Sequence, residues 1–159
     1  MNLMKAVAVT PRVERSARLI EASVPTPSED QVRVKTIRVG IDGTDVEIDR
    51  AEYGEAPTGE KYLIIGHESF GQVESAGAKV KDFAPGEYVV AMVRHPDDCH
   101  HCRAGEQDMC LSGNYTERGI KGHHGFLSEY YVETPPYLIK IPSVLKEVGV
   151  MLEPLTVVE

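Results

Sequence analysis

The segment Gln31-Val32-Arg33-Val34-Lys35-Thr36-Ile37-Arg38-Val39 carries the clearest secondary-structure signal in the chain. Valines alternate with polar residues from Gln31 to Lys35, as they do on a strand with one buried face. The alternation slips by one residue at Thr36-Ile37 and then resumes with Ile37 and Val39. An inserted residue of this kind is typical of a β-bulge, so we expect a strand with one irregularity here.

Shorter β-rich runs recur along the rest of the chain, and Gly and Pro separate them. We expect further strands at Lys5–Val9, Gly71–Val73, Tyr88–Met92, Ser128–Val132 and Tyr137–Ile141. Helical signal is sparse and is limited to two segments, each with its first residue as the expected N-cap: Thr44–Asp49 and Ser143–Leu152. The expected fold class is mainly β, a small irregular barrel with few short helices.

Composition restricts the classes of protein that this chain can represent. A length of 159 residues suits one domain with a proper core. The net charge of -8 argues against nucleic acid or an anionic membrane as a partner, although it also fits good solubility alone. No apolar run approaches the ~20 residues that span a bilayer, and the N-terminus lacks the pattern of a signal peptide. We therefore expect a cytoplasmic protein.

Four side chains beside Gly- or Pro-marked turns can hold a catalytic metal: Asp42, His67, Glu68 and Glu153. An imidazole with carboxylates is a donor set for zinc with an open position, which can polarise a hydroxyl or carbonyl. Taken singly, these residues have ordinary interpretations. Asp42 suits a plain turn, Thr44 an N-cap, and the pair His67-Glu68 a solvent-facing turn.

The region from Arg94 to Gly125 differs in kind, because it is rich in His, Asp, Cys and Gly and poor in strand pattern. Such a long loop in a compact domain needs a function, or a cross-link or bound metal that holds it in place. Its three cysteines, Cys99, Cys102 and Cys110, are odd in number and closely spaced. That clustering indicates a metal knuckle in a reducing compartment rather than a disulfide framework.

Together these motifs resemble the zinc-dependent medium-chain dehydrogenase/reductase family over essentially the whole chain. The resemblance is carried by Gly66-His67-Glu68 followed by Gly71 and Gly77, by the run Val80–Val89, by Cys99-x2-Cys102-x7-Cys110 and by the turn Gly40–Asp45. The segments Asp42–Asp45, Tyr115–Ile120, Gly125-Phe126 and Pro136–Pro142 look most like the archaeal-type glucose dehydrogenases, which oxidise aldoses at C1 with NAD(P). The resemblance implies a GroES-like barrel.

For the catalytic site, the resemblance implies a zinc held by Asp42, His67 and Glu153, with Glu68 as an intermittent ligand or an outer support. Thr44 would pass on the proton of the substrate hydroxyl, so Thr44 and Glu68 are the catalytic candidates. Thr44, Glu117 and Glu153 are the substrate-binding candidates, and a solvated loop acid is the alternative for Glu117. Most members have Cys where this chain has Asp42, and Val157 replaces an acid that contacts sugar in some relatives.

For the region 94–125, the resemblance implies a structural zinc lobe with Cys99, Cys102 and Cys110 as ligands. Pro96 stands where the family pattern has a further Cys, and proline cannot ligate. The fourth donor could come from Asp97, Asp98, His95 or His100, of which Asp97 is favoured. A lobe without metal, carrying three free thiols, is the alternative. We assign His123 and His124 to loop structure.

No Gly-x-Gly-x-x-Gly motif follows a strand anywhere in the 159 residues. We therefore expect residues 1–159 to be a GroES-like catalytic domain without the C-terminal Rossmann cofactor domain. The implied function is an NAD(P)-dependent, zinc-dependent glucose or aldose 1-dehydrogenase with a small-molecule sugar substrate, a homo-oligomer in its full-length form. The isolated chain would bind zinc and be inactive. Two alternatives are a stand-alone metal- or ligand-binding module and a chaperonin-like ring protein.

Overall fold

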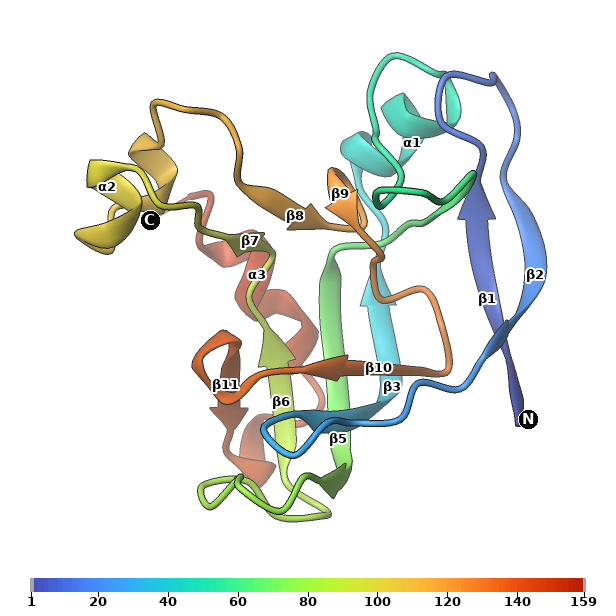
Figure 1. Ribbon diagram of the computed structural model, residues 1–159. Coiled ribbons are helices and arrows are strands. Elements are labelled where there is room, and N and C mark those ends of the chain that lie inside the picture. Colours follow the sequence, from blue (N-terminus) through green and yellow to red (C-terminus); the bar gives the residue numbers. More distant parts are fainter. Residues whose placement is uncertain (1, 159) are drawn as a thin grey trace.

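Eleven strands arranged in three sheets form most of the fold in the computed structural model, which describes residues 2–158 (Figure 1). A three-stranded sheet has the order β2-β1-β4, with β1 at Leu3–Val9, β2 at Arg18–Ser23 and β4 at Leu63–Ile64. A five-stranded sheet has the order β10-β3-β5-β6-β11, with bounds Tyr130–Glu133, Val32–Gly40, Glu68–Ala76, Tyr88–Ala91 and Leu138–Ile141. The third sheet joins β7 (Arg94–His95), β8 (Thr116–Arg118) and β9 (Gly122–His123). The mainly β fold expected from the sequence is confirmed.

The helices are short, as expected, and they lie between or after the strands. The α-helices are α1 at Gly43–Asp49, α2 at His100–Arg103 and α3 at Leu152–Leu155. The 3-10 helices are η1 at Gln107–Met109, η2 at Pro135–Tyr137, η3 at Ser143–Leu145 and η4 at Gly149–Met151.

The expected irregularity in β3 is present. Its pairing with the antiparallel strand β5 shifts register between Thr36 and Arg38, and a second shift lies between Arg33 and Val34. Val32 and Val34 are fully buried, so the alternating pattern identified the inward face correctly. Burying a valine fully contributes about 1.5–3 kcal/mol, which fixes the register of this strand against slippage.

The main core lies under the five-stranded sheet, where apolar side chains from β3, β5, β6, β10 and β11 pack around Phe126. A second cluster joins Ile48 of α1 to Val9 of β1 and Leu63 of β4. These two clusters fix the positions of α1 and of the start of β5, the elements that border the candidate site.

Helix α1 begins one residue earlier than predicted, and the prediction that Thr44 caps it is wrong. Asp42 is the N-cap: its side chain accepts hydrogen bonds from the backbone N–H groups of Thr44 (2.8 Å) and Asp45 (3.3 Å). Asp45 completes a capping box by accepting from the Asp42 backbone N–H at 3.3 Å. A carboxylate two residues earlier outcompetes the Thr44 hydroxyl because it can accept from two orphan N–H groups at once.

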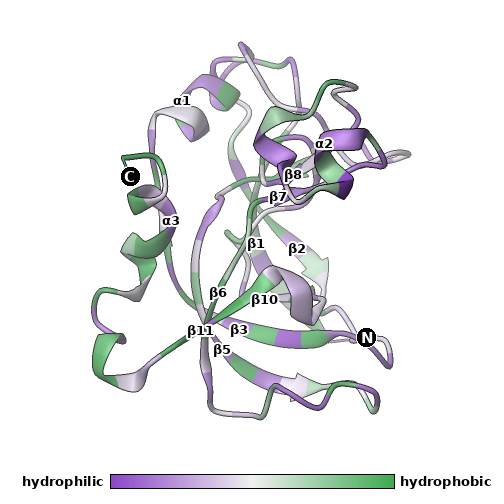
Figure 2. Ribbon diagram, turned by 90° about the vertical axis from the view of Figure 1, so that its left-hand side faces the viewer, coloured by the Kyte–Doolittle hydropathy of each residue, from purple (hydrophilic) through white to green (hydrophobic). Residues whose placement is uncertain are grey.

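The predicted helix over 143–152, capped by Ser143, is also wrong. The segment forms η3, η4 and α3 in succession, and Ser143 makes no capping hydrogen bond because Pro142 holds that position. Gly149 interrupts the helical propensity, and a Cβ there would collide with the Phe70 ring. This close approach lets η4 pack against β5 and leads the chain to Glu153. The segment is largely apolar and lies along one side of the molecule (Figure 2).

The region 94–125 is more regular than expected, because it contains β7, β8, β9, α2 and η1. Strands of two or three residues are too short to show an alternating pattern, and backbone pairing rather than side-chain burial defines them. His123, assigned to a loop, is the last residue of β9. The part that carries α2 and η1 projects away from the barrel and is called the lobe from here on (Figure 1).

Candidate metal centre and substrate pocket

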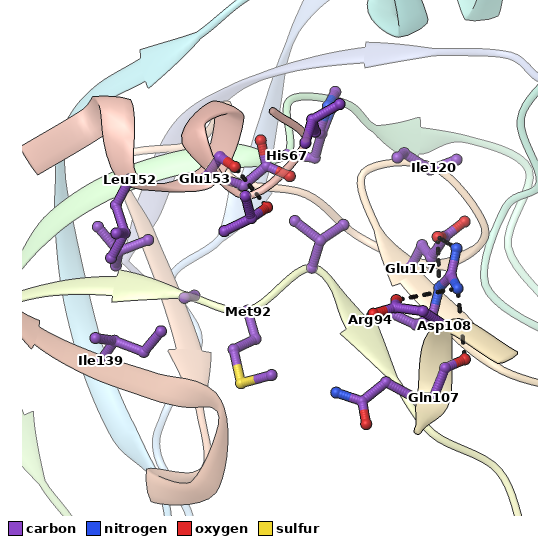
Figure 3. Close-up of a pocket in the computed structure, with 15 residues that line it drawn as sticks. His67, Met92, Arg94, Gln107, Asp108, Glu117, Ile120, Ile139, Leu152 and Glu153 are labelled. Carbon is purple, nitrogen blue, oxygen red and sulfur yellow. Dashed lines mark hydrogen bonds and ion pairs between the residues drawn. The ribbon is translucent and has the colours of Figure 1, made fainter. Parts of the chain in front are cut away.

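A pocket of about 480 Å³ lies where the barrel, the lobe and the C-terminal helices meet (Figure 3). His67 and Glu153 lie on one side of it, and Arg94, Asp108 and Glu117 lie on the other. Apolar side chains line much of the rest of the pocket, including Val93, Ile120, Ile139 and Leu152. A mostly apolar hollow with a few convergent polar groups is the usual form of a small-molecule site.

His67 is almost completely buried at the start of β5. Gly66 before it has a φ of +84°, and a side chain there would strike Leu127 and Val39, so glycine is required. The Gly66 N–H donates to Asp45 Oδ1 at 3.0 Å, which ties the turn to α1. His67 Nε2 lies 3.7 Å from Asp42 Oδ2. The sequence therefore brings residues 42 and 67 together through one glycine turn and one helix cap.

Glu68 and Glu153 also reach His67. One ligand atom from each of these three residues lies within 4.8 Å of the others. Burial raises the pKa of both carboxyls; His67 opposes this shift, and Asp42 adds to it in each case. Because the charged carboxylates repel one another here, a cation between them would relieve an existing strain.

Gly40 explains how Glu68 can share the site with the residue directly before it. His67 lies outside the strand, whereas Glu68 is the first residue of β5 and pairs with Gly40 of β3. A Cβ on Gly40 would overlap Glu68 Oε2, so the carboxylate lies over the bare glycine. Strand alternation therefore does not separate residues 67 and 68, and Glu68 lies close enough to be a ligand.

Asp42 has two functions because its two oxygens are used differently. Oδ1 caps α1, while Oδ2 faces His67 and accepts a hydrogen bond from the Thr44 hydroxyl at 3.3 Å. The hydroxyl of Thr44 thus lies directly beside the candidate ligand group. A turn residue and a metal ligand were offered as alternatives for Asp42 from the sequence, and the geometry allows both at once.

Asp45 belongs to the site although it was not among the predicted site residues. It is 4% exposed, burial raises its pKa, and its Oδ2 lies 4.0 Å from His67 Nδ1. That Nδ1 is buried without a hydrogen-bond partner within residues 2–158. A carboxylate beside the second nitrogen of a ligating histidine commonly orients the ring. The spacing Asp42-x-x-Asp45, a capping box, was the sequence signal that could have revealed it.

Glu117 is buried in β8 and lines the same pocket, so the interpretation as a solvated loop acid is wrong. Arg94 of the paired strand β7 donates to Glu117 Oε1 through Nε (2.9 Å) and Nη2 (2.8 Å). Val157, the residue that departs from the sugar-binding pattern, also lines the pocket and is exposed.

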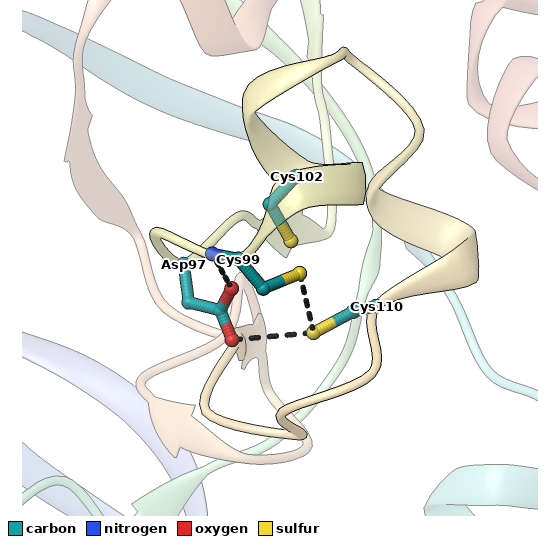
Figure 4. A group of neighbouring side chains, drawn as sticks. All are labelled: Asp97, Cys99, Cys102 and Cys110. Carbon is teal, nitrogen blue, oxygen red and sulfur yellow. Dashed lines mark hydrogen bonds between the residues drawn. The ribbon is translucent and has the colours of Figure 1, made fainter.

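The lobe gathers its three cysteines around Asp97 (Figure 4). Sulfur atoms of Cys99 and Cys110 lie 3.8 Å apart, and Cys110 Sγ lies 3.2 Å from Asp97 Oδ2. Backbone N–H groups of Cys102 and Leu111 lower the pKa of Cys99 to about 7, which favours the thiolate. Of the four predicted fourth donors, Asp97 is the one in this group; His95 instead stacks on Tyr137 at 4.0 Å and faces Glu133 at 3.1 Å.

Both donor sets fit zinc. Tetrahedral zinc with bonds of about 2.3 Å to sulfur separates two thiolates by about 3.8 Å, which matches Cys99 and Cys110. Three thiolates and one carboxylate give zinc four protein ligands, the number that a closed structural site needs. The residues around His67 combine an imidazole with carboxylates, and His67 and Glu153 line a pocket, as an open zinc site requires.

Residues 28–143 match the alcohol dehydrogenase GroES-like domain. The chain belongs to this family. It is 49% identical over 158 residues to a glucose 1-dehydrogenase of Methanocella arvoryzae and 48% identical over 156 residues to glucose 1-dehydrogenase 1 of Caldivirga maquilingensis. Each match covers 98% of this chain and 44% of the relative, so the chain spans less than half the length of these proteins.

Among solved structures, a glucose dehydrogenase of Haloferax mediterranei in complex with NADP, zinc and gluconolactone is similar at a TM-score of 0.87 and 37% identity. The match covers 98% of this chain and 43% of that one. The expected GroES-like barrel and the resemblance to archaeal glucose dehydrogenases are thus confirmed. Within residues 2–158, no helix of this GroES-like domain is long and apolar enough to cross a membrane.

Replacing Gly40 by alanine should weaken zinc binding at the His67 centre by about tenfold or more, since the new Cβ displaces the Glu68 carboxylate. Gly43→Ala is the matched control, because a Cβ at residue 43 meets nothing within 4 Å. Competition with a chelator measures both affinities, and the lobe zinc serves as an internal reference. Equal affinities in the two variants would contradict the placement of Glu68.

Glu153→Gln should stabilise the metal-free chain at pH 7. A raised carboxyl pKa means that the folded state binds the proton more tightly than the unfolded state, so stability falls as pH rises above about 4. The amide lacks this penalty, and the advantage should shrink as pH falls toward 4. Thermal unfolding at several pH values measures it, with the exposed Glu52→Gln as control. In the presence of zinc the sign should reverse, because a ligand is lost.

Proposed function

We propose that this chain is the zinc-binding catalytic domain of an NAD(P)-dependent aldose 1-dehydrogenase, with glucose as the reference substrate. The observation that carries the proposal is the arrangement around His67. Asp42 Oδ2 lies 3.7 Å from its Nε2, Glu68 and Glu153 form a further donor group with it, and His67 and Glu153 line a pocket that Glu117 also lines. The identity to glucose 1-dehydrogenases over 98% of this chain supports the same activity class. We also propose that residues 1–159 form one GroES-like catalytic domain and that the lobe belongs to a structural zinc region at about 94–125.

In this mechanism, His67, Asp42 and Glu153 would hold the catalytic zinc. Glu68 lies close enough to be an intermittent ligand or to support the other ligands from outside. Bound zinc supplies Lewis-acid polarisation of the C1 hydroxyl and lowers its pKa. Thr44 Oγ1 would accept the hydroxyl proton while releasing its own proton to Asp42 Oδ2, to which it already donates, and so toward solvent. Glu117, and Glu153 through an oxygen not used for the metal, accept hydrogen bonds from the other sugar hydroxyls.

The pocket chemistry favours a neutral polyhydroxy substrate over an anionic one. Its polar wall is mainly acidic, with Asp108, Glu117 and Glu153 present, and carboxylates accept hydrogen bonds from hydroxyl groups. The apolar side chains between them can cover the carbon skeleton and exclude water during transfer. The nicotinamide cofactor would bind to a separate dinucleotide-binding domain, since the 159 residues contain no Gly-x-Gly-x-x-Gly motif.

Zinc content separates the two centres. The purified chain should hold about two zinc ions, His67→Ala about one, and Asp97→Ala about one, because each variant removes a ligand from one site only. Elemental analysis measures the ratio, and loss of the lobe zinc alone should lower the unfolding temperature more. A ratio unchanged in His67→Ala would overturn the catalytic assignment.

The 159-residue chain should bind an aldose only when zinc is present, and it should not reduce NADP with glucose. Ligand-observed NMR with the zinc-loaded and chelator-treated chain measures the first, and absorbance at the nicotinamide band measures the second. Glucose-dependent NADP reduction by this chain would contradict the assignment of the cofactor site to another domain. Zinc-independent binding would contradict the metal's role in holding the sugar.

A further inference from the structure

Arg94 lies between the candidate sugar acceptor and the lobe (Figure 3). It occupies β7 opposite Glu117 of β8, at the junction where the lobe leaves the barrel. Its side chain is 27% exposed, and hydrogen bonds or ion pairs extend from it in two directions. Arg94 is neither a proposed metal ligand nor the proposed proton acceptor, so the proposed function gives it no role.

Toward the barrel, Arg94 holds one oxygen of Glu117 and leaves the other unused. Nε and Nη2 both donate to Oε1, at 2.9 and 2.8 Å, while Oε2 makes no hydrogen bond with any residue that the structure describes. The two donors restrain Oε1, so Oε2 of this pocket-lining side chain remains available as an acceptor. Paired N–H groups of arginine are well suited to fixing a carboxylate.

Toward the lobe, Arg94 Nη1 lies 3.4 Å from the backbone oxygen of Gln107 and 3.3 Å from Asp108 Oδ1. Both acceptors belong to η1, which ends one residue before Cys110. Cys110 is one of the four residues gathered for the lobe metal. The outer contacts of Arg94 are thus joined to Cys110 through one short helix.

An aromatic ring limits the remaining freedom of the guanidinium. The Arg94 Cζ lies 4.4 Å from the centre of the Tyr115 ring, and Lys121 Nζ lies 4.2 Å from the same ring. Cation–π contacts of this kind hold a guanidinium group over the face of the ring. All three guanidinium nitrogens thus have protein partners, which leaves little capacity for a separate anionic ligand.

We propose that Arg94 is a positioning residue that presents Glu117 Oε2 to a sugar hydroxyl and makes this presentation depend on the metal state of the lobe. The proposal rests on the proposed function for the identity of the ligand. The lobe then does more than stabilise the fold, because its zinc contributes to sugar affinity through η1, Arg94 and Glu117.

The first experiment measures aldose binding to the zinc-loaded chain by ligand-observed NMR. Arg94→Met should weaken glucose binding about tenfold, a loss typical of a hydrogen bond to a charged group, while both zinc ions stay bound. Arg103→Met, at an exposed arginine of the lobe helix α2, is the control and should bind as the unmodified chain does. Millimolar guanidinium should partly restore binding to Arg94→Met, whereas the same concentration of methylammonium should not.

The second experiment tests the dependence on the lobe. Cys110→Ser, which removes the lobe zinc, should weaken glucose binding severalfold in the presence of Arg94 and have no further effect in Arg94→Met. Such a double-mutant cycle isolates the coupling between the two residues. Additive effects would overturn the proposed link to the lobe.

A measurement that needs no sugar tests the link between Arg94 and the lobe independently of the proposed function. The 15N–1H signal of Arg94 Nε, identified by its absence from Arg94→Lys, should shift or broaden when Cys110→Ser removes the lobe zinc. An unchanged signal would overturn the link, and unchanged glucose affinity in Arg94→Met would overturn the positioning role. Absence of any glucose binding by the unmodified zinc-loaded chain would instead overturn the proposed function, while the Arg94 signal still tests the link.

Discussion

Burial of carboxylates beside one buried imidazole, His67, is the constraint on which the candidate site of this domain depends. Asp42, Glu68 and Glu153 come from the start of a helix, the start of a strand and the C-terminal segment, and all approach His67. Burial raises the pKa of Glu68 and Glu153, so their ionised forms are disfavoured until a cation is present. The fold thus holds in place a charge distribution that is unfavourable without metal and suited to binding it.

Three glycines, at positions where a side chain would not fit, allow the carboxylates to approach His67. Gly66 requires a positive φ, and Gly40 leaves room for the Glu68 carboxylate. Gly149 allows η4 to approach Phe70, which places Glu153 opposite β5. In each case a side chain would displace a ligand group by steric overlap rather than by any change in its chemistry.

Sequence patterns predicted the elements that have a strong periodic or chemical signal. The alternation of residues 31–35 predicted the buried face of β3, and the slip after it predicted the bulge, although Ile37 beyond the bulge is exposed. The cysteine spacing indicated a lobe that gathers Cys99, Cys102 and Cys110. Predictions failed where two neighbouring groups compete for one task. Asp42 rather than Thr44 caps α1, because its carboxylate accepts from two N–H groups. The helix predicted over 143–152 breaks into short turns at Pro142 and Gly149.

The sequence by itself determined the mainly β class, the candidate ligands Asp42, His67, Glu68 and Glu153, and the resemblance to zinc-dependent dehydrogenases, because these depend on residue type, order and spacing. Only the tertiary structure decided which fourth donor reaches the cysteines, that Asp45 lies beside His67, and that Arg94 connects Glu117 to the lobe. These relations join side chains from separate strands and turns, and their distances depend on how the sheets pack. Local sequence carries no record of such distances.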